Sequence, residues 1–99
     1  MLVVIGHLRF PPGTRAAVLA ALTEVVITSR AEAGCLFYDF AEDVIEPDLF
    51  RVSEGWRDAE ALRTHFASTH FQQFSATREG LGMTERVVAI YETPGPTTV

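Results

Sequence analysis

The chain has 99 residues, a length that accommodates one domain and leaves no room for a second catalytic module. It is 47% hydrophobic and 21% charged, which is typical of a globular protein and not of a disordered one. The net charge is −5 at pH 7, with eight basic residues scattered among thirteen acidic ones. This balance argues against nucleic-acid binding, because phosphate recognition needs clustered Lys and Arg.

The cysteine content and the amino terminus indicate the cellular context. The single cysteine, Cys35, excludes an internal disulfide and any multi-cysteine zinc or iron–sulfur site, and it fits a reducing cytoplasm. The apolar run at the start spans only about five residues with no basic segment before it, so we expect neither a secretion signal nor a membrane span.

The first third of the chain predicts a strand followed by a helix. Residues 2–10 are apolar on both parities and end at a Pro-Pro-Gly turn. Thr14 is a plausible N-cap for a helix over residues 15–32, and Gly34 suits a left-handed stop just beyond it. The spacing of apolar residues places the inner stripe of this helix at Val18, Leu22, Val25 and Val26.

The rest of the chain predicts a hairpin, two helical segments and a last strand. The strands rich in β-formers cover residues 35–43, 49–56 and 85–92. Asp58 is expected to cap a helix through Phe66, and Ser68 or Thr69 to begin a shorter one that ends near residue 77. One domain over residues 1–93 and a flexible tail over 94–99 complete the expected organisation.

This order predicts a ferredoxin-like α+β fold, βαββαβ, with a four-stranded antiparallel sheet. Its helices would cover only one face of the sheet. The first two strands are nonetheless apolar on both sides, so the helix-free face should also be covered. We therefore expect a homodimer that forms through that face.

Residues 54–74 carry the strongest functional signal. A Trp ends an alternating strand, and two His residues and three Phe residues follow on helical segments. Such a segment predicts an aromatic pocket with titratable imidazoles.

The same residues resemble the antibiotic biosynthesis monooxygenase family. The resemblance is carried by Glu54 and Trp56 at the end of a strand, the acid-rich helix start, the pair His65 and His70, and Phe71 and Phe74. Residues 33–38 are similar to the start of the family's second strand, with Ala where Pro is common. The match runs over roughly residues 2–92.

The resemblance implies a dimeric α+β barrel with a cavity between sheet and helices. It implies a cofactor-independent monooxygenase that uses O₂ to oxidise a small electron-rich aromatic of the quinol, phenol or anthrone type. No metal or flavin is expected, because such a substrate reduces O₂ itself. Where the haem-degrading relatives have an axial His, this chain has Phe74 or Ser75, so haem is not expected either. The alternatives are a non-catalytic barrel that binds a hydrophobic ligand or serves in a stress response, and an isomerase-like lactone enzyme.

The expected site residues follow from this reading. His65 would be the general base, since an imidazole with a pKa near 6.5 accepts a phenolic proton at neutral pH, with Trp56 beside it in the chemistry. The substrate-binding residues would be His7, Tyr38, Glu54, Phe66, His70 and Phe74. Each also has a plain structural interpretation, such as a core histidine or a packing aromatic. The spacing of five between the two histidines argues against a metal, because it does not place both on one helical face. Glu32 would belong to a solvated helix face.

Overall fold

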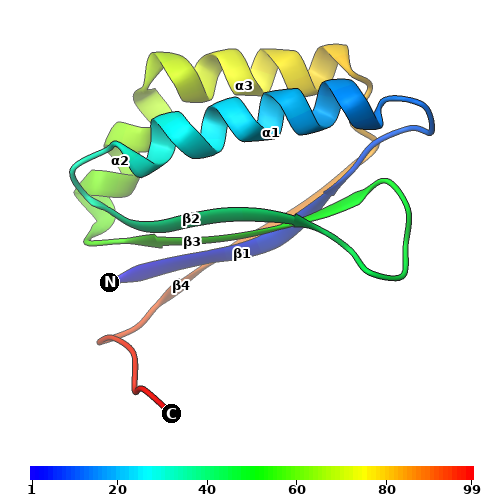
Figure 1. Cartoon of the computed structure of the whole chain (residues 1–99). Helices are drawn as coiled ribbons and strands as arrows, with labels where there is room; N and C mark the ends of the chain where they lie inside the picture. The colour runs from blue at the N-terminus through cyan, green and yellow to red at the C-terminus, as the bar shows by residue number, and fades with distance from the viewer.

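The computed structural model describes all 99 residues and has one four-stranded sheet with three helices. The elements in chain order are β1 (Leu2–Arg9), α1 (Arg15–Arg30), β2 (Cys35–Glu42), β3 (Leu49–Trp56), α2 (Ala59–Ala67), α3 (Thr69–Gly80) and β4 (Glu85–Glu92). All three helices lie on one face of the sheet, with α1 and α3 side by side (Figure 1). The segment after β4 leaves the body of the fold.

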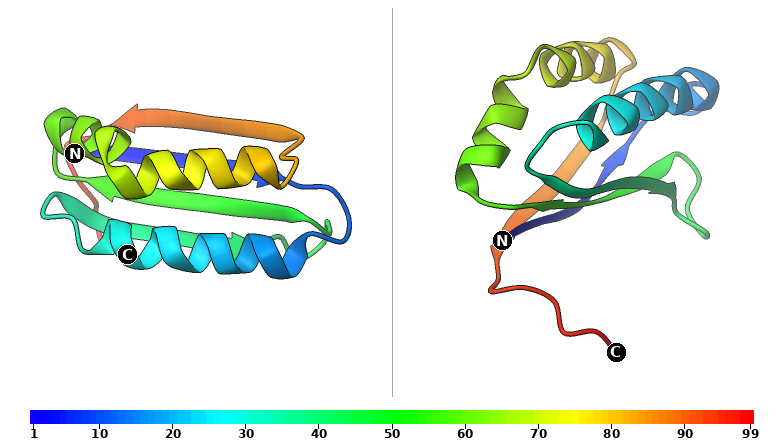
Figure 2. Two further views of the ribbon diagram at one scale, coloured as in Figure 1. Left: turned by 90° about the horizontal axis from the view of Figure 1, so that it is seen from above. Right: turned by 60° about the vertical axis from the view of Figure 1, so that its left-hand side comes forward.

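The strand order is β2-β3-β1-β4, and every neighbouring pair is antiparallel. This is the ferredoxin-like topology that the sequence predicts. The central strand β1 pairs Leu2 with Trp56 of β3 on one side and with Glu92 of β4 on the other. Seen from above, α1 runs along the β2 edge, whereas β4 forms the opposite edge and is not covered by a helix (Figure 2).

The predicted inner stripe of α1 is largely confirmed, with Val18, Leu22, Val25 and Ser29 buried and Val26 half-buried. The Thr14 side chain, however, caps no amide; its hydroxyl donates to the Pro11 carbonyl instead. The prediction for Gly34 is also wrong, because its φ is not positive. A Cβ at Gly34 would lie 2.3 Å from the Ala61 Cβ, so the glycine allows α2 to approach the loop closely.

Two side-chain caps shape the following helices. Asp58 accepts a hydrogen bond from the Ala61 amide and begins α2, as predicted. Ser68 has an extended backbone and accepts a hydrogen bond from the Phe71 amide, so the chain stops one helix and starts the next at that residue. Helix α3 therefore runs in a new direction over the sheet (Figure 2).

The core lies between the helices and the sheet, and it includes Trp56, Tyr38, Phe50 and Leu8, each at most 2% exposed. The helix-free face remains apolar and open. Ile5, Val87 and Tyr91 are each more than half exposed there. No helix is long and apolar enough to cross a membrane.

Candidate active site

A cavity of about 200 Å³ lies between α3 and the helix-covered face of the sheet. Ten of its thirteen lining residues are hydrophobic, which distinguishes it from the larger, more polar groove between α1 and α3. The lining residues are Val4, Leu8, Tyr38, Phe40, Val52, Glu54, Phe66, Phe71, Phe74, Arg78, Arg86, Val88 and Ile90. An apolar cavity with a few polar groups is the usual form of a small-molecule site.

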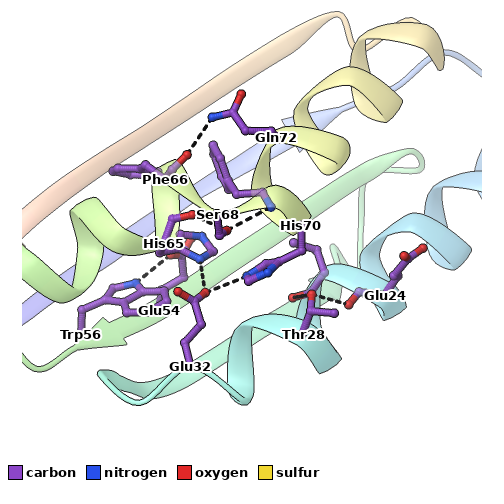
Figure 3. A network of polar contacts seen from close by, with 12 residues as sticks. Glu24, Thr28, Glu32, Glu54, Trp56, His65, Phe66, Ser68, His70 and Gln72 are labelled. Atoms are coloured by element: carbon purple, nitrogen blue, oxygen red, sulfur yellow. Dashed lines mark hydrogen bonds and ion pairs between the residues drawn. The ribbon is translucent and has the colours of Figure 1, made fainter.

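Glu54 is the carboxylate of this cavity. It is 7% exposed, and its Oε1 accepts a 2.9 Å hydrogen bond from Trp56 Nε1 (Figure 3). Burial raises the pKa of Glu54 to about 7, although the bond from Trp56 and the charge of Arg86 pull the pKa down. At neutral pH this carboxylate can therefore both accept and release a proton.

Trp56 and His65, which the sequence proposes as catalytic residues, are both 0% exposed and are not among the residues that line the cavity. Their rings lie 4.5 Å apart. The His65 ring is also 4.9 Å from Phe71 and 5.4 Å from Tyr38, two residues that do line the cavity. The imidazole thus lies behind the cavity wall, and the indole N–H is occupied by Glu54.

Glu32 joins the two histidines of the site. Its Oε2 lies 2.6 Å from His65 Nδ1 and 2.8 Å from His70 Nε2 (Figure 3). Burial lowers the pKa of His65, while Glu32 opposes this effect, so the contact at neutral pH is a hydrogen bond from a neutral imidazole and not a full ion pair. The expectation that Glu32 belongs to a solvated face is wrong, because its side chain is only 14% exposed.

The same three groups have the donor types of a zinc site, and their ligand atoms lie within 4.8 Å of one another. The spacing argument against a metal compared the two histidines along a single helix, although the sequence also predicts a new helix from Ser68 or Thr69. The break at Ser68 places His65 on α2 and His70 on α3, so a separation of five residues still brings the two rings together.

The remaining predicted residues divide between the cavity and other surfaces. Tyr38, Glu54, Phe66 and Phe74 line the cavity. His70 borders the groove between α1 and α3. His7 lies on the helix-free face, where its Nε2 is 2.6 Å from Oε1 of Glu85.

Nine of the thirteen lining residues were not predicted as site residues, and the two charged ones among them are Arg78 and Arg86. Arg78 follows Phe71 and Phe74 at helical spacings of seven and four, and Arg86 shares strand parity with Val88 and Ile90. Both signals are present in the sequence, but each arginine alone looks like an ordinary surface residue.

The fold and the cavity define a small ferredoxin-like α+β protein with an apolar cavity between its sheet and its helices. The chain belongs to the antibiotic biosynthesis monooxygenase family, whose model matches residues 1–77. This match leaves β4 outside, although β4 supplies three of the cavity residues.

The chain is also similar to individual proteins and to a solved structure. "Putative monooxygenase YcnE" of Bacillus subtilis is 36% identical over 76 residues, which cover 77% of this chain and 80% of that protein. An uncharacterized Synechocystis protein, sll1783, is 34% identical over 73 residues, 74% of this chain, and the match spans half of that protein's length. The crystal structure of a "putative antibiotic biosynthesis monooxygenase" from Deinococcus radiodurans superposes with a TM-score of 0.93 at 26% identity, covering 100% of this chain and 98% of the other.

Proposed function

We propose that the protein is a monooxygenase that uses O₂ to oxidise a small electron-rich aromatic of the quinol or phenol type. The observation that carries the proposal is the aromatic cavity with one buried carboxylate, Glu54, whose pKa is raised to about 7. The volume of about 200 Å³ suits one substituted ring better than a three-ring anthrone, since a cavity of roughly 150 Å³ holds benzene.

Glu54 is the proposed base. It removes a phenolic proton, and the resulting anion transfers an electron to O₂. The radical pair combines at a ring carbon that carries hydrogen, and the hydroperoxide loses water to leave a carbonyl. The substrate supplies all four electrons: one oxygen atom enters the product and the other leaves as water. Trp56 acts as a positioning residue, because its N–H holds the Glu54 carboxylate in place.

The role of His65 differs between this proposal, in which Glu54 is the base, and the sequence prediction, in which His65 is the base. If His65 is the base, its imidazole must reach the substrate from behind Tyr38 and Phe71. The proposal gives it instead a supporting role, in which the bond to Glu32 holds the ring against Trp56.

Oxygen uptake with a panel of quinols and phenols tests the proposal. We expect one O₂ consumed per substrate, and a rate that rises with pH through about 7 as Glu54 ionises. Glu54→Gln should lower turnover by about 10²-fold or more, the usual scale of a general base. Glu24→Gln, at an exposed position on α1, is the matched control.

A Glu54→Gln variant that keeps its turnover would show that Glu54 is not the base. A His65→Gln variant that folds and loses at least as much turnover as Glu54→Gln would show the same.

A second candidate function is a non-catalytic barrel that binds a hydrophobic ligand. The complete burial of both Trp56 and His65 favours it. Binding of the panel without any O₂ uptake would select this alternative.

The proposed assembly is a cytoplasmic homodimer formed through the helix-free face. Support comes from the exposed apolar side chains of that face. Phe37 adds to them: its ring lies over Gly55, so close that a Cβ at Gly55 would be 2.3 Å from it, and it remains 38% exposed. The free, half-buried thiol of Cys35 is compatible with a reducing compartment.

A further inference from the structure

Two of the three arginines that have no carboxylate partner lie at the cavity. All eight basic residues are arginines. Five of them form ion pairs with carboxylates: Arg9, Arg15, Arg30, Arg51 and Arg57. The three without a carboxylate partner are Arg63, Arg78 and Arg86, and the last two line the cavity. In a chain with thirteen acidic residues, an unpaired cation at an apolar cavity needs an explanation.

Arg78 is held as a fixed, unsatisfied donor. Its guanidinium carbon lies 5.6 Å from the centre of the Phe71 ring and 5.4 Å from that of Phe74, so two aromatic residues fix its position. Its Nε is buried and has no hydrogen-bond partner. A buried donor without a partner is costly, and a planar guanidinium matches the two oxygens of a carboxylate.

Arg86 adds a second positive charge at the same cavity. It comes from β4, where it is paired in register with the buried Leu8 of β1. Burial lowers the pKa of Arg78, and the charge of Arg86 lowers it further. The same charge acts to lower the pKa of Glu54 against the larger effect of burial, so Arg86 reaches both polar groups of the cavity. Arg86 itself is exposed, so it lies where the cavity meets the solvent.

Glu54 does not neutralise these two cations. No ion pair joins it to either arginine, and its hydrogen-bond partner is Trp56. Burial also keeps it partly protonated near neutral pH. The cavity therefore has an excess of positive charge, which an anionic ligand would balance.

We propose that the cavity binds small aromatic acids, with the ligand's carboxylate at Arg78 and Arg86 and its ring among Phe66, Phe71 and Phe74. This inference rests on the proposed function and narrows its substrate class to hydroxylated aromatic carboxylates. The carboxylate end of the ring would face α3 and β4. The hydroxyl end would then face Glu54.

Binding of a matched pair of probes tests the inference separately from turnover. The probes are 2,5-dihydroxybenzoate and its uncharged methyl ester, titrated against the full chain by calorimetry. We expect the acid to bind at least about 10-fold more tightly than the ester. Arg78→Gln should weaken binding of the acid by about 10- to 100-fold and leave the ester within about threefold. The control is Arg63→Gln, which removes the third unpaired arginine from an exposed position on α2.

Arg86→Gln provides a second test at an exposed residue. It should weaken binding of the acid and leave binding of the ester unchanged. Equal or tighter binding of the ester, equal losses of both probes in the arginine variants, or no binding of the acid up to millimolar concentration would each overturn the inference. Acid that binds through Arg78 but consumes no O₂ would instead leave the inference standing and contradict the proposed oxygenase activity.

Discussion

Trp56 donates its indole N–H to the carboxylate of Glu54, two residues earlier on the same face of β3, over 2.9 Å. The bond removes the indole from direct contact with a ligand and lowers the pKa of Glu54 against the larger effect of burial. Burial thus sets the raised pKa of Glu54, and the bond from Trp56 brings it closer to neutral pH.

The first prediction concerns this bond. Trp56→Phe keeps an aromatic ring and removes the donor, so the pKa of Glu54 should rise above about 7. The midpoint of the pH–rate profile should move in the alkaline direction, with a smaller change in the plateau rate. An unshifted midpoint in a folded variant would show that Glu54 does not govern the profile.

The second prediction links Glu54 to stability. Its pKa is about 7 in the folded chain and 4.5 without the fold, so the folded state binds more protons between these values. Stability should therefore fall as the pH rises from about 4.5 to about 7, by about 3 kcal/mol for a shift of this size. Glu54→Gln lacks this loss, so the stability of the variant relative to the wild type should increase over the same range.

Urea denaturation at several pH values measures this difference. The control is Glu24→Gln, at an exposed position on α1, whose difference from the wild type should stay constant with pH. A constant difference for Glu54→Gln as well would mean that the Glu54 carboxyl titrates normally in the folded state.

The third prediction concerns Glu32. Glu32→Ala removes the acceptor of the buried His65 Nδ1–H and should lower the free energy of unfolding by about 1–3 kcal/mol. Glu24→Ala, which also removes a glutamate but makes no side-chain contact with a histidine, should change it by less than about 0.5 kcal/mol. Similar changes in the free energy of unfolding for the two variants would show that Glu32 stabilises the fold no more than an exposed glutamate does.

The fourth prediction is that Glu32, His65 and His70 do not bind Zn²⁺ stoichiometrically at pH 7. Coordination by His65 Nδ1 would move the ring proton to Nε2, which is buried and has no acceptor. Calorimetric titration with Zn²⁺ checks this. A 1:1 isotherm that disappears in His70→Ala would establish a metal site here.

The fifth prediction concerns the assembly. Val87→Asp places a charge on the exposed helix-free face and should convert the proposed dimer to a monomer in light scattering at micromolar concentration. Val44→Asp is the matched control, since Val44 is 94% exposed in the loop between β2 and β3. A wild-type chain that already scatters as a monomer would contradict the dimer.

Local sequence patterns were sufficient to predict the order and type of the helices and strands. The β-formers of residues 49–56 and 85–92 predicted β3 and β4 to the residue, and the Asp58 cap placed the start of α2. These signals are local, because strand parity, helical spacing and cap chemistry depend on neighbours in the chain. Helix ends were less well predicted: α1 stops at Arg30 and α3 continues to Gly80, since packing decides where a helix frays.

By itself, the sequence determined the α+β topology, the aromatic character of the site and four of its cavity residues. Only the tertiary structure decided which titratable group reaches the cavity. His65 lies on an inward helical stripe, as its spacing indicates, but Phe71 from the next helix and Tyr38 from β2 cover it. The depth of a side chain behind such a wall depends on packing between separate elements, and no periodicity within one element encodes it. The same packing brought Glu32, remote in sequence, to both histidines and left Arg78 beside the cavity without a partner.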